Sequence, residues 1–214
     1  MHPYLWPDSY GQVCDLPWEE YGEIIQKPIT SPGVFVFDNP VVEIFSQTAW
    51  YEVPMVWLPI VTCMLLAANT LDTAYIALGA VLWMFLEYLL HRYLFHSHLC
   101  SPRLHFLLHG LHHILPTDDQ RLVFPPLATA IIATPIYLCV YAVFGSTHSL
   151  LVMAGILLGY VLYDMIHYAI HHVKDLPRPF SWLRARHMYH HFRDHTANFG
   201  ISSPLVDLLF ATSN

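Results

Sequence analysis

The sequence predicts an all-α integral membrane protein with about four transmembrane helices. Three observations favour this fold class: 55% of the 214 residues are hydrophobic, only 12% are charged, and the mean hydropathy is +0.42. A soluble globular domain carries about 25% charged residues. Acidic residues outnumber basic ones by 16 to 9, and the basic residues form no cluster that could bind a nucleic-acid backbone. The composition therefore argues against both a soluble domain and a nucleic-acid-binding protein.

Residues 1–50 form a separate region, which we expect to be an acidic cytosolic arm, extended and with little regular structure. Its one basic residue, Lys27, is set against seven acidic ones: Asp8, Asp15, Glu19, Glu20, Glu23, Asp38 and Glu43. The first residues, MHPYLWPDSYGQV, contain neither a basic stretch nor an apolar one, so they do not predict a cleavable signal peptide. Membrane insertion is therefore expected to use internal segments.

Residues 51–214 form the predicted membrane domain, with spans at about 53–68, 74–94, 122–144 and 150–170. The first run, Val53 to Ala68, has 16 residues. As a helix it measures about 24 Å, against about 30 Å for the hydrocarbon core, so we expect it to span only together with its neighbours. The third run carries no charge.

The positions of the basic residues predict the orientation of these spans. Basic residues occur in the arm, between the second and third spans, and after the fourth, whereas the loops at 69–73 and 145–149 have none. The positive-inside rule therefore places the N-terminus, the middle loop and the C-terminal tail in the cytosol. Fourteen of the 16 histidines lie on the cytosolic segments from His91 onward, and His148 falls on the opposite side.

Ten of these histidines form four motifs near the ends of the predicted helices. The motifs are HRYLFH (His91 and His96), HGLHH (His109, His112 and His113), HYAIH (His167 and His171) and HMYHH (His187, His190 and His191). Residues at i, i+3 and i+4 lie on one face of a helix, so each motif presents several imidazoles in one direction. At this chain's own histidine frequency about 0.09 copies of H-x2-HH are expected by chance, and two occur. The pattern indicates metal ligands.

Ten imidazoles are too many for one metal and would supply five ligands to each of two metals. Each metal would then keep an open coordination position for water or dioxygen, which favours catalysis. None of the motifs contains a carboxylate that could bridge two metals at about 3.5–4 Å, so we expect a wider separation. His91 and His96 are about 140° apart on an ideal helix, so they reach one centre only if the helix bends or ends there; otherwise they serve two metals.

Two carboxylates share a helical face with predicted ligands. Glu87 is four residues before His91, and Asp164 is three residues before His167. We expect each to accept an N–H from its ligating imidazole and to fix the tautomer of that ring. The alternative is a charged side chain that reaches the membrane interface without a role in the site.

Other residues that often bind metals lie outside these motifs. The cysteines show no CxxC spacing, which argues against a disulfide framework or a thiolate metal site: Cys14, Cys63, Cys100 and Cys139. Six histidines also fall outside the motifs: His2, His98, His105, His148, His172 and His195.

At these motifs the sequence resembles the membrane fatty acid hydroxylase and desaturase superfamily, and within it the fatty acid 2-hydroxylases. The narrower resemblance rests on HFLLHGLHHILPTDDQRLVFPP (His105 to Pro126), WYEVPMVWLPIV (Trp50 to Val61), YDMIHYAIHH (Tyr163 to His172) and RHMYHHF (Arg186 to Phe192). It covers most of residues 40–210. The stretch from His105 to Pro126 is its most specific part.

The resemblance implies two iron ions held by the ten histidines, with zinc able to replace iron on isolation. It also implies that O2 supplies a hydroxyl to carbon 2 of a fatty acyl chain, free or in a ceramide or sphingolipid, at the endoplasmic reticulum membrane, with the motifs facing the cytosol. Many family members carry a cytochrome b5-like domain with an HPGG motif, whereas here His2 and Pro3 are followed by Tyr4. We therefore expect electrons from a separate protein such as cytochrome b5.

Two other hypotheses compete with that of a fatty acid 2-hydroxylase. A related desaturase or sterol oxidase would share the histidine motifs, but the stretch from His105 to Pro126 disfavours it. A metal or proton transporter would need polar residues through the depth of several spans. The uncharged third span and the crowding of histidines at one membrane face make a transporter the weaker reading.

Overall fold

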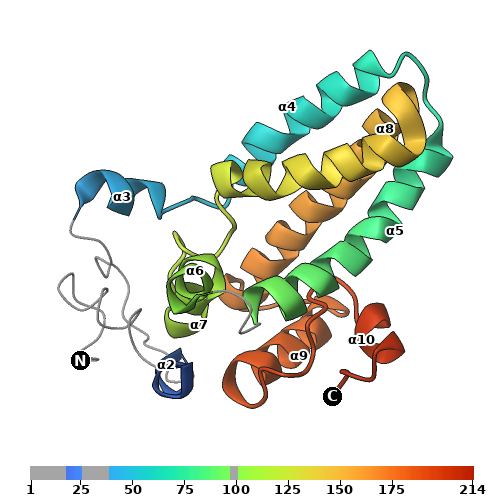
Figure 1. Cartoon of the computed structure of the whole chain (residues 1–214). Helices are drawn as coiled ribbons and strands as arrows, with labels where there is room; N and C mark the ends of the chain where they lie inside the picture. Colours follow the sequence, from blue (N-terminus) through green and yellow to red (C-terminus); the bar gives the residue numbers. More distant parts are fainter. Residues whose placement is uncertain (1–17, 26–38, 97–100) are drawn as a thin grey trace.

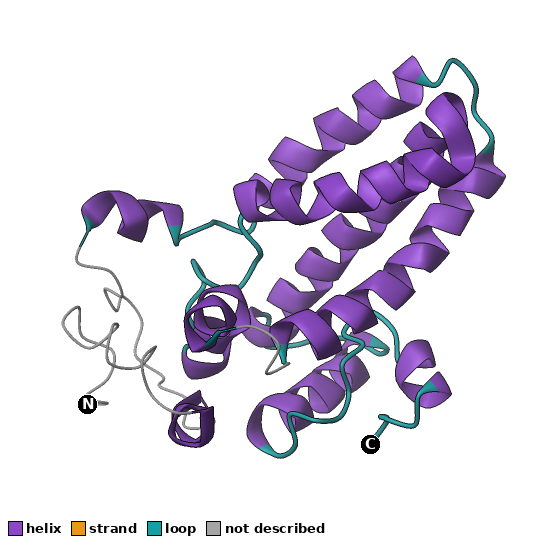
Figure 2. Cartoon of the chain, in the orientation of Figure 1, coloured by secondary structure: helices purple, strands orange, loops and turns teal. Residues whose placement is uncertain are grey.

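A computed structural model describes residues 18–25, 39–96 and 101–214, and throughout this part the regular elements are helical (Figure 2). The apolar helices of the bundle are α4 (Glu52–Ala67), α5 (Thr73–Leu89) and α8 (Pro126–His172). The shorter elements are α2 (Trp18–Ile25), α3 (Pro40–Phe45), the π-helix η2 (Leu90–Phe95), α6 (Pro102–His105), the π-helix η3 (Phe106–Gly110), α7 (Leu111–Ile114), α9 (Phe180–Phe192) and α10 (Leu205–Leu209). The predicted all-α class is confirmed for these residues.

Helix α8 consists of two limbs that run back along each other. Its 47 residues are interrupted at Gly145, whose φ of 70° and ψ of −174° are not helical. Glycine adopts a positive φ without a steric cost, so the chain can reverse at this position. Figure 1 shows the first limb in yellow turning at the top of the molecule into the second limb in orange. The two limbs correspond to the third and fourth predicted spans.

The length and apolar character of the helices indicate where the chain can cross a membrane. Among the described residues, two helices are long and apolar enough to cross a membrane, Thr73–Phe95 and Pro126–His172, and α4 is a shorter apolar helix of 16 residues. The outer faces of these helices carry exposed apolar side chains, among them Leu66 at 71% and Val143 at 74% exposure. Such surfaces favour contact with lipid over contact with water.

Helices α5 and α8 pack closely through two glycines. A Cβ atom at Gly79 would lie 2.1 Å from the carbonyl oxygen of Val152, and one at Gly155 would lie 2.1 Å from that of Ile76. These distances are far shorter than any real contact, so a larger residue cannot fit at either crossing. Small residues at an interface let two membrane helices approach closely, and this packing fixes the end of α5 beside the second limb of α8.

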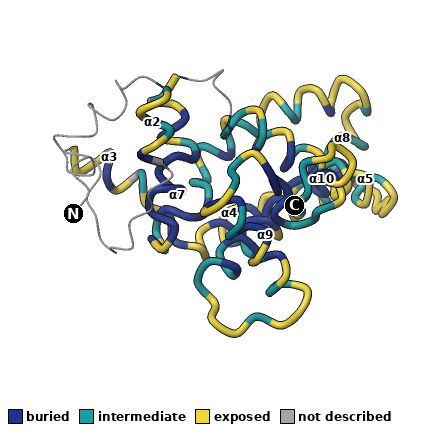
Figure 3. Tube along the Cα trace, turned by 90° about the horizontal axis from the view of Figure 1, so that it is seen from below, coloured by how far each residue is buried: buried dark blue, intermediate teal, exposed yellow. Residues whose placement is uncertain are grey.

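The remaining elements form a cap at one end of this bundle. The end of α8 and the elements η2, η3, α7 and α9 meet there (Figure 1). In Figure 3, where the molecule is seen from below, α7 is drawn dark blue because all four of its residues are buried. The cap is therefore a second packed region beneath the apolar helices.

The N-terminal arm is more ordered than the sequence indicates. The expectation of little regular structure is wrong for two segments, because α2 and α3 form within residues 1–50. The Tyr21 hydroxyl lies 2.7 Å from His105 Nδ1, and the Glu43 carboxylate forms an ion pair with Arg121. These contacts hold both helices against the cap. Cys63 and Cys139 are free thiols, and the predictions for Cys14 and Cys100 lie outside the described residues.

Candidate metal centre

The ten histidines of the four motifs gather in the cap as two groups of five. In each group the nearest ring nitrogens all lie within 4.8 Å of one another. We call the first group centre 1: His91, His96, His109, His113 and His190. We call the second group centre 2: His112, His167, His171, His187 and His191. The structure thus places together all ten residues that the sequence selects, and the two groups share no member.

A π-helical turn brings His91 and His96 to the same centre. Both lie at η2, where the amide N–H of His96 donates to the carbonyl of His91 over 3.1 Å. This bond joins residues i and i+5, so the turn is wider than an α-helical turn and returns to the same face after five residues. On an ideal α-helix these two residues are about 140° apart, but the π-helical turn lets both imidazoles reach one ion.

The spacing of the imidazole nitrogens fits a metal ion at each centre. In centre 2, Nε2 of His187 lies 2.9 Å from that of His167, 2.8 Å from that of His171 and 3.0 Å from that of His191. In centre 1 the corresponding Nε2 distances run from 2.9 to 3.1 Å. Ligands about 2.1 Å from a metal are about 3.0 Å apart at right angles and about 3.4 Å apart in a tetrahedron. The observed spacing fits right angles.

Each centre is arranged as a square pyramid of imidazoles. The ring centroid of His171 lies 4.8 to 5.1 Å from those of the other four rings in centre 2. The rings of His112 and His187 are nearly parallel, at 12°, with centroids 6.1 Å apart, as expected for ligands on opposite sides of an ion. In centre 1, His96 holds the apical place, 4.6 to 4.9 Å from the other four centroids. The position opposite each apical imidazole carries none of the five rings.

Backbone carbonyls fix the tautomer of three of these imidazoles. Nδ1 of His91 lies 2.6 Å from the Phe199 carbonyl, and Nδ1 of His190 lies 2.8 Å from the Ala197 carbonyl. In centre 2, Nδ1 of His171 lies 2.9 Å from the Pro116 carbonyl. A carbonyl oxygen can only accept, so each Nδ1 carries the hydrogen and each Nε2 keeps a lone pair for a metal.

Burial keeps the imidazoles of the cap neutral. It lowers the pKa well below the usual value for seven ligands outside the long helices: His96, His109, His112, His113, His187, His190 and His191. Desolvation is the largest cause, and neighbouring imidazoles lower each pKa further because two like charges would repel. A metal binds the neutral ring, so this shift favours metal binding.

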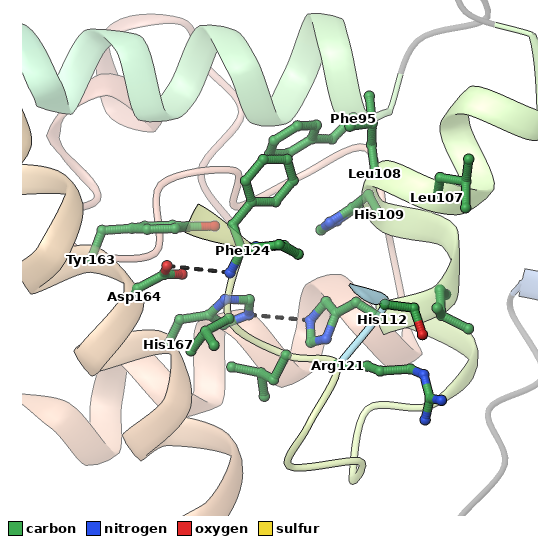
Figure 4. Close-up of a pocket in the computed structure, with 15 residues that line it drawn as sticks. Phe95, Leu107, Leu108, His109, His112, Arg121, Phe124, Tyr163, Asp164 and His167 are labelled. Carbon is green, nitrogen blue, oxygen red and sulfur yellow. Dashed lines mark hydrogen bonds between the residues drawn. The ribbon is translucent and has the colours of Figure 1, made fainter. Parts of the chain in front are cut away.

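A cavity of about 230 Å³ lies beside both centres. His109 of centre 1 and His112 and His167 of centre 2 line it, whereas the apical imidazoles do not. Figure 4 shows these rings with Phe95, Phe124, Tyr163 and Asp164 around the same space. The cavity therefore borders both centres, through one basal imidazole of centre 1 and two of centre 2.

A second, apolar cavity of about 60 Å³ continues into the helical bundle. Its walls come from α5 and both limbs of α8, including Trp83, Ile136 and Met153. Phe95, Phe124 and Tyr163 line both cavities and form the boundary between them. The rings of Phe95 and Phe124 are stacked with centroids 5.6 Å apart.

Neither predicted carboxylate accepts its hydrogen bonds from an imidazole. Asp164 is 1% exposed, and its Oδ2 accepts from the amide N–H of Phe124 over 3.3 Å. Its Oδ1 is buried and makes no hydrogen bond within the described part of the chain, and the residue lines the larger cavity. Glu87 accepts from the backbone of Ile201 and Ser202. Three of the ligating rings turn Nδ1 toward a backbone carbonyl, and for His91 the Phe199 carbonyl takes the place that sequence reasoning gave to Glu87.

Sequence reasoning also missed the buried cluster around Arg121. This side chain donates to Asp118 over 2.7 Å and to Glu43, and all three residues are buried. The Asp118–Arg121 spacing was a detectable signal in the stretch PTDDQRL, but nothing in the sequence joins Glu43 to it. The carbonyls of Ala197, Phe199 and Pro116 carry no sequence signal.

Comparison with known proteins relates this chain to one enzyme family. The family model described as fatty acid hydroxylase matches residues 76–212. A dihydroceramide fatty acyl 2-hydroxylase of Arabidopsis thaliana is 38% identical over 204 residues, which cover 91% of this chain and 86% of the relative. The fatty acid 2-hydroxylase of Homo sapiens is 35% identical over 240 residues, which cover 98% of this chain and 63% of the relative.

A solved structure shows the same fold. It is described as full-length scs7p with only the hydroxylase domain visible, and it superimposes with a TM-score of 0.87 at 34% identity. The match covers 95% of this chain and 82% of that one. The related ceramide very long chain fatty acid hydroxylase of Saccharomyces cerevisiae is 38% identical over 181 residues, which cover 79% of this chain and 47% of the relative.

Proposed function

This chain belongs to the fatty acid hydroxylase family, and we propose that it uses O2 and two iron ions to place a hydroxyl on carbon 2 of a fatty acyl chain. The observation that carries the proposal is the pair of five-histidine centres beside a cavity that adjoins a second, apolar cavity. Centre 1 and centre 2 would each hold one ion. A saturated C–H bond resists acid–base chemistry, so a redox metal must supply the oxidising power.

Iron is the metal that this chemistry requires. Zinc has no accessible redox couple, although neutral nitrogen ligands bind Zn²⁺ more tightly than Fe²⁺. Zinc can therefore replace iron on isolation and leave an inactive protein. In the overall reaction one C–H bond and O2 take up two electrons and two protons and give one C–OH group and one water. The two electrons would come from a separate donor protein such as cytochrome b5.

The acyl chain would lie across the boundary between the two cavities. Its tail would occupy the apolar slot among Trp83, Ile136 and Met153, and its first carbons would pass Phe124 into the cavity beside the centres. Each methylene that leaves water in this way contributes about 0.8 kcal/mol to binding. This placement brings the carbons next to the carboxyl end close to His109 and His167, and so supports oxidation at carbon 2.

The charges around the larger cavity favour an acyl amide over a free fatty acid. Asp164 lines the cavity, and its Oδ1 is buried and makes no hydrogen bond within the described residues. Arg121 also lines the cavity, but Glu43 and Asp118 already neutralise it. A free carboxylate would find no charge partner in the paired Arg121, whereas the N–H or hydroxyl of a ceramide could donate to Asp164. The names of the Arabidopsis and yeast relatives, which refer to dihydroceramide and ceramide, support this choice.

We place the enzyme in the endoplasmic reticulum membrane with its cap in the cytosol. The two long apolar helices support a membrane location, and the distribution of basic residues supports this orientation. We further propose that α4, α5 and the two limbs of α8 make four crossings. His148 lies 19 residues before His167 on α8, or about 28 Å of helix, so it would sit near the opposite face.

Lipid analysis of cells that express single variants tests the proposal. His112→Ala, His171→Ala and His190→Ala each remove an imidazole from one of the two centres, and each is expected to abolish 2-hydroxylated acyl chains. His148→Ala is the matched control, because this ring stacks on Tyr75 at 4.3 Å, far from the cap. Normal 2-hydroxy lipid in any of the first three, or hydroxylation only far along the chain, would refute the proposal.

A further inference from the structure

A buried loop, residues 197–202, covers one side of centre 1 between α9 and α10. Its carbonyls at Ala197 and Phe199 accept from Nδ1 of His190 and His91. The Phe199 ring also contacts both imidazoles edge-on, with centroid distances of 5.7 and 5.6 Å. It contacts His96, a third ligand of centre 1, at 5.8 Å. The loop therefore touches three of the five ligands of this centre.

Two carboxylates hold the loop in place. Glu87 Oε1 accepts from the amide N–H of Ile201 at 2.5 Å and of Ser202 at 2.8 Å, and its Oε2 accepts from the Ser202 hydroxyl. Asp207 accepts from the amides of Phe199 and Gly200 at 2.9 and 2.8 Å. Both carboxylates are at most 3% exposed. Buried carboxylates that accept several N–H bonds hold a backbone segment firmly.

Gly200 shows how closely the loop is packed. A Cβ atom at this position would lie 2.1 Å from the carbonyl oxygen of Ser203 and 3.0 Å from Asp207 Oδ2. The turn from Gly200 to Ser203 therefore has no room for a side chain at this position.

Centre 2 has different support. His171 is bonded through Nδ1 to the Pro116 carbonyl. The Nδ1 atoms of the other four ligands are buried without a hydrogen-bond partner among the described residues: His112, His167, His187 and His191. A ligating imidazole whose N–H is held by an acceptor binds its metal more tightly, and loss of such a partner costs about 10–100-fold in affinity.

We propose that Glu87 is a positioning residue for centre 1 alone: through the 197–202 loop it holds the carbonyls that orient His91 and His190, and so it sets how tightly centre 1 retains its metal. This inference rests on the proposed two-metal site. Glu87 would act on the imidazoles indirectly: its hydrogen bonds hold the loop backbone, and the carbonyls of the loop hold the imidazoles. Its action also makes the two centres unequal, because Glu87 supports ligands of centre 1 and none of centre 2.

Metal retention in single-centre backgrounds tests this inference. His171→Ala removes the apical ligand of centre 2 and leaves centre 1 complete, and His96→Ala does the reverse. The full chain is purified with iron in detergent, and the iron-to-protein ratio is measured by elemental analysis across a chelator titration. Glu87→Leu is then added to each background. In the His171→Ala background we expect Glu87→Leu to lower the chelator concentration that removes half of the iron by about 10–100-fold. In the His96→Ala background we expect this concentration not to change.

Three further variants distinguish a positioning role from general damage to the fold. Glu52→Leu makes the same change at the start of α4, where Glu52 Oε1 accepts from the amide N–H of Ala49, and should leave both centres unchanged. Glu87→Gln keeps an oxygen for the two amides and should restore retention almost fully. If Glu87→Leu does not fold, Ser202→Ala removes one contact of the carboxylate and should shift centre 1 in the same direction by a smaller factor.

The possible results separate the inference from the proposed function. Equal loss of metal from both centres, or loss from neither, would overturn the role of Glu87 and leave the two-metal proposal standing. Fewer than two metals bound by the unmodified chain would overturn both.

Discussion

Replacing Asp164 by asparagine should separate the stability of the protein from its activity. Asparagine has the same shape and keeps an oxygen that can accept from the Phe124 amide, now 3.3 Å from the carboxylate. The change removes a carboxylate that is 1% exposed and has one oxygen without a hydrogen bond in the described residues. The lost charge-assisted bond and the relieved desolvation oppose each other, so we expect the free energy of unfolding to change by at most about 1 kcal/mol.

The same substitution should strongly reduce product formation. In the proposed complex the carboxylate of Asp164, which lines the cavity, would accept a hydrogen bond from the amide or hydroxyl of a ceramide, and a bond to a charged group contributes about 1.5–3 kcal/mol. Its loss corresponds to about a 10- to 150-fold fall in rate. We would measure 2-hydroxylated ceramide by mass spectrometry with a supplied redox partner, and thermal unfolding of the same preparations in detergent.

Asp118→Asn is the matched control. Asp118 is also a buried carboxylate of the cap, but it is 2.7 Å from Arg121, so its loss weakens an ion pair by about 1.5–3 kcal/mol. At about 2–4 °C per kcal/mol for a chain of this size, Asp118→Asn should lower the melting temperature by about 3–12 °C, and Asp164→Asn by no more than about 4 °C. If Asp164→Asn lost as much stability as Asp118→Asn and kept its rate, Asp164 would be structural.

Three further outcomes follow from the geometry. Burial lowers the pKa of imidazoles such as His112 and His187 in the folded protein, so below the unfolded-state histidine pKa of about 6.5 the unfolded chain binds more protons than the folded one. The free energy of unfolding should therefore fall as the pH drops below about 6.5, by about 1.4 kcal/mol per pH unit for each histidine, and thermal unfolding across pH measures this loss. Gly155→Val should disrupt the α5–α8 crossing and aggregate on size-exclusion chromatography, whereas Gly22→Ala, with open space around it, should not. Phe124→Ala should join the two cavities and broaden the chain-length profile of the product in lipid mass spectrometry, and an unchanged profile would exclude Phe124 as the boundary.

The features of this molecule that can be predicted from the sequence are those that follow from the periodicity of its side chains. Apolar runs indicate α5 and both limbs of α8, and histidine spacing selects all ten residues that the cap brings together. The turn at Gly145 was expected only as a loop, because the long apolar runs on either side of it end there. The helices of the N-terminal arm were missed because they are held by distant partners, such as His105 for Tyr21, and not by their own sequence.

The supporting contacts of the site were not predictable for a different reason. Glu87 lies one helical turn before His91, which made a direct hydrogen bond the simplest expectation. In the fold, 108 residues separate His91 from the carbonyl of Phe199 that takes that place. Backbone carbonyls are present at every residue, so a sequence gives no sign of which one will face an imidazole.

The division of the ligands between the two centres does follow from helix geometry. Adjacent residues on a helix are about 100° apart, so the two imidazoles of an HH pair cannot converge on one ion, whereas residues i and i+4 can. In HGLHH, His109 and His113 accordingly join centre 1 and His112 joins centre 2. In HMYHH the assignment is reversed, with His187 and His191 in centre 2 and His190 in centre 1.

Both centres therefore depend on the same two histidine segments, HGLHH and HMYHH. Each of the two H-x2-HH segments gives two imidazoles to one centre and one to the other, so neither segment can shift without moving ligands of both centres. The remaining ligands come from single-centre pairs at the ends of the long helices, His91 and His96 for centre 1 and His167 and His171 for centre 2. The apical rings, His96 and His171, both belong to these pairs. The membrane helices therefore supply the ligands that are specific to one centre, and the cap supplies those that keep the two centres in register.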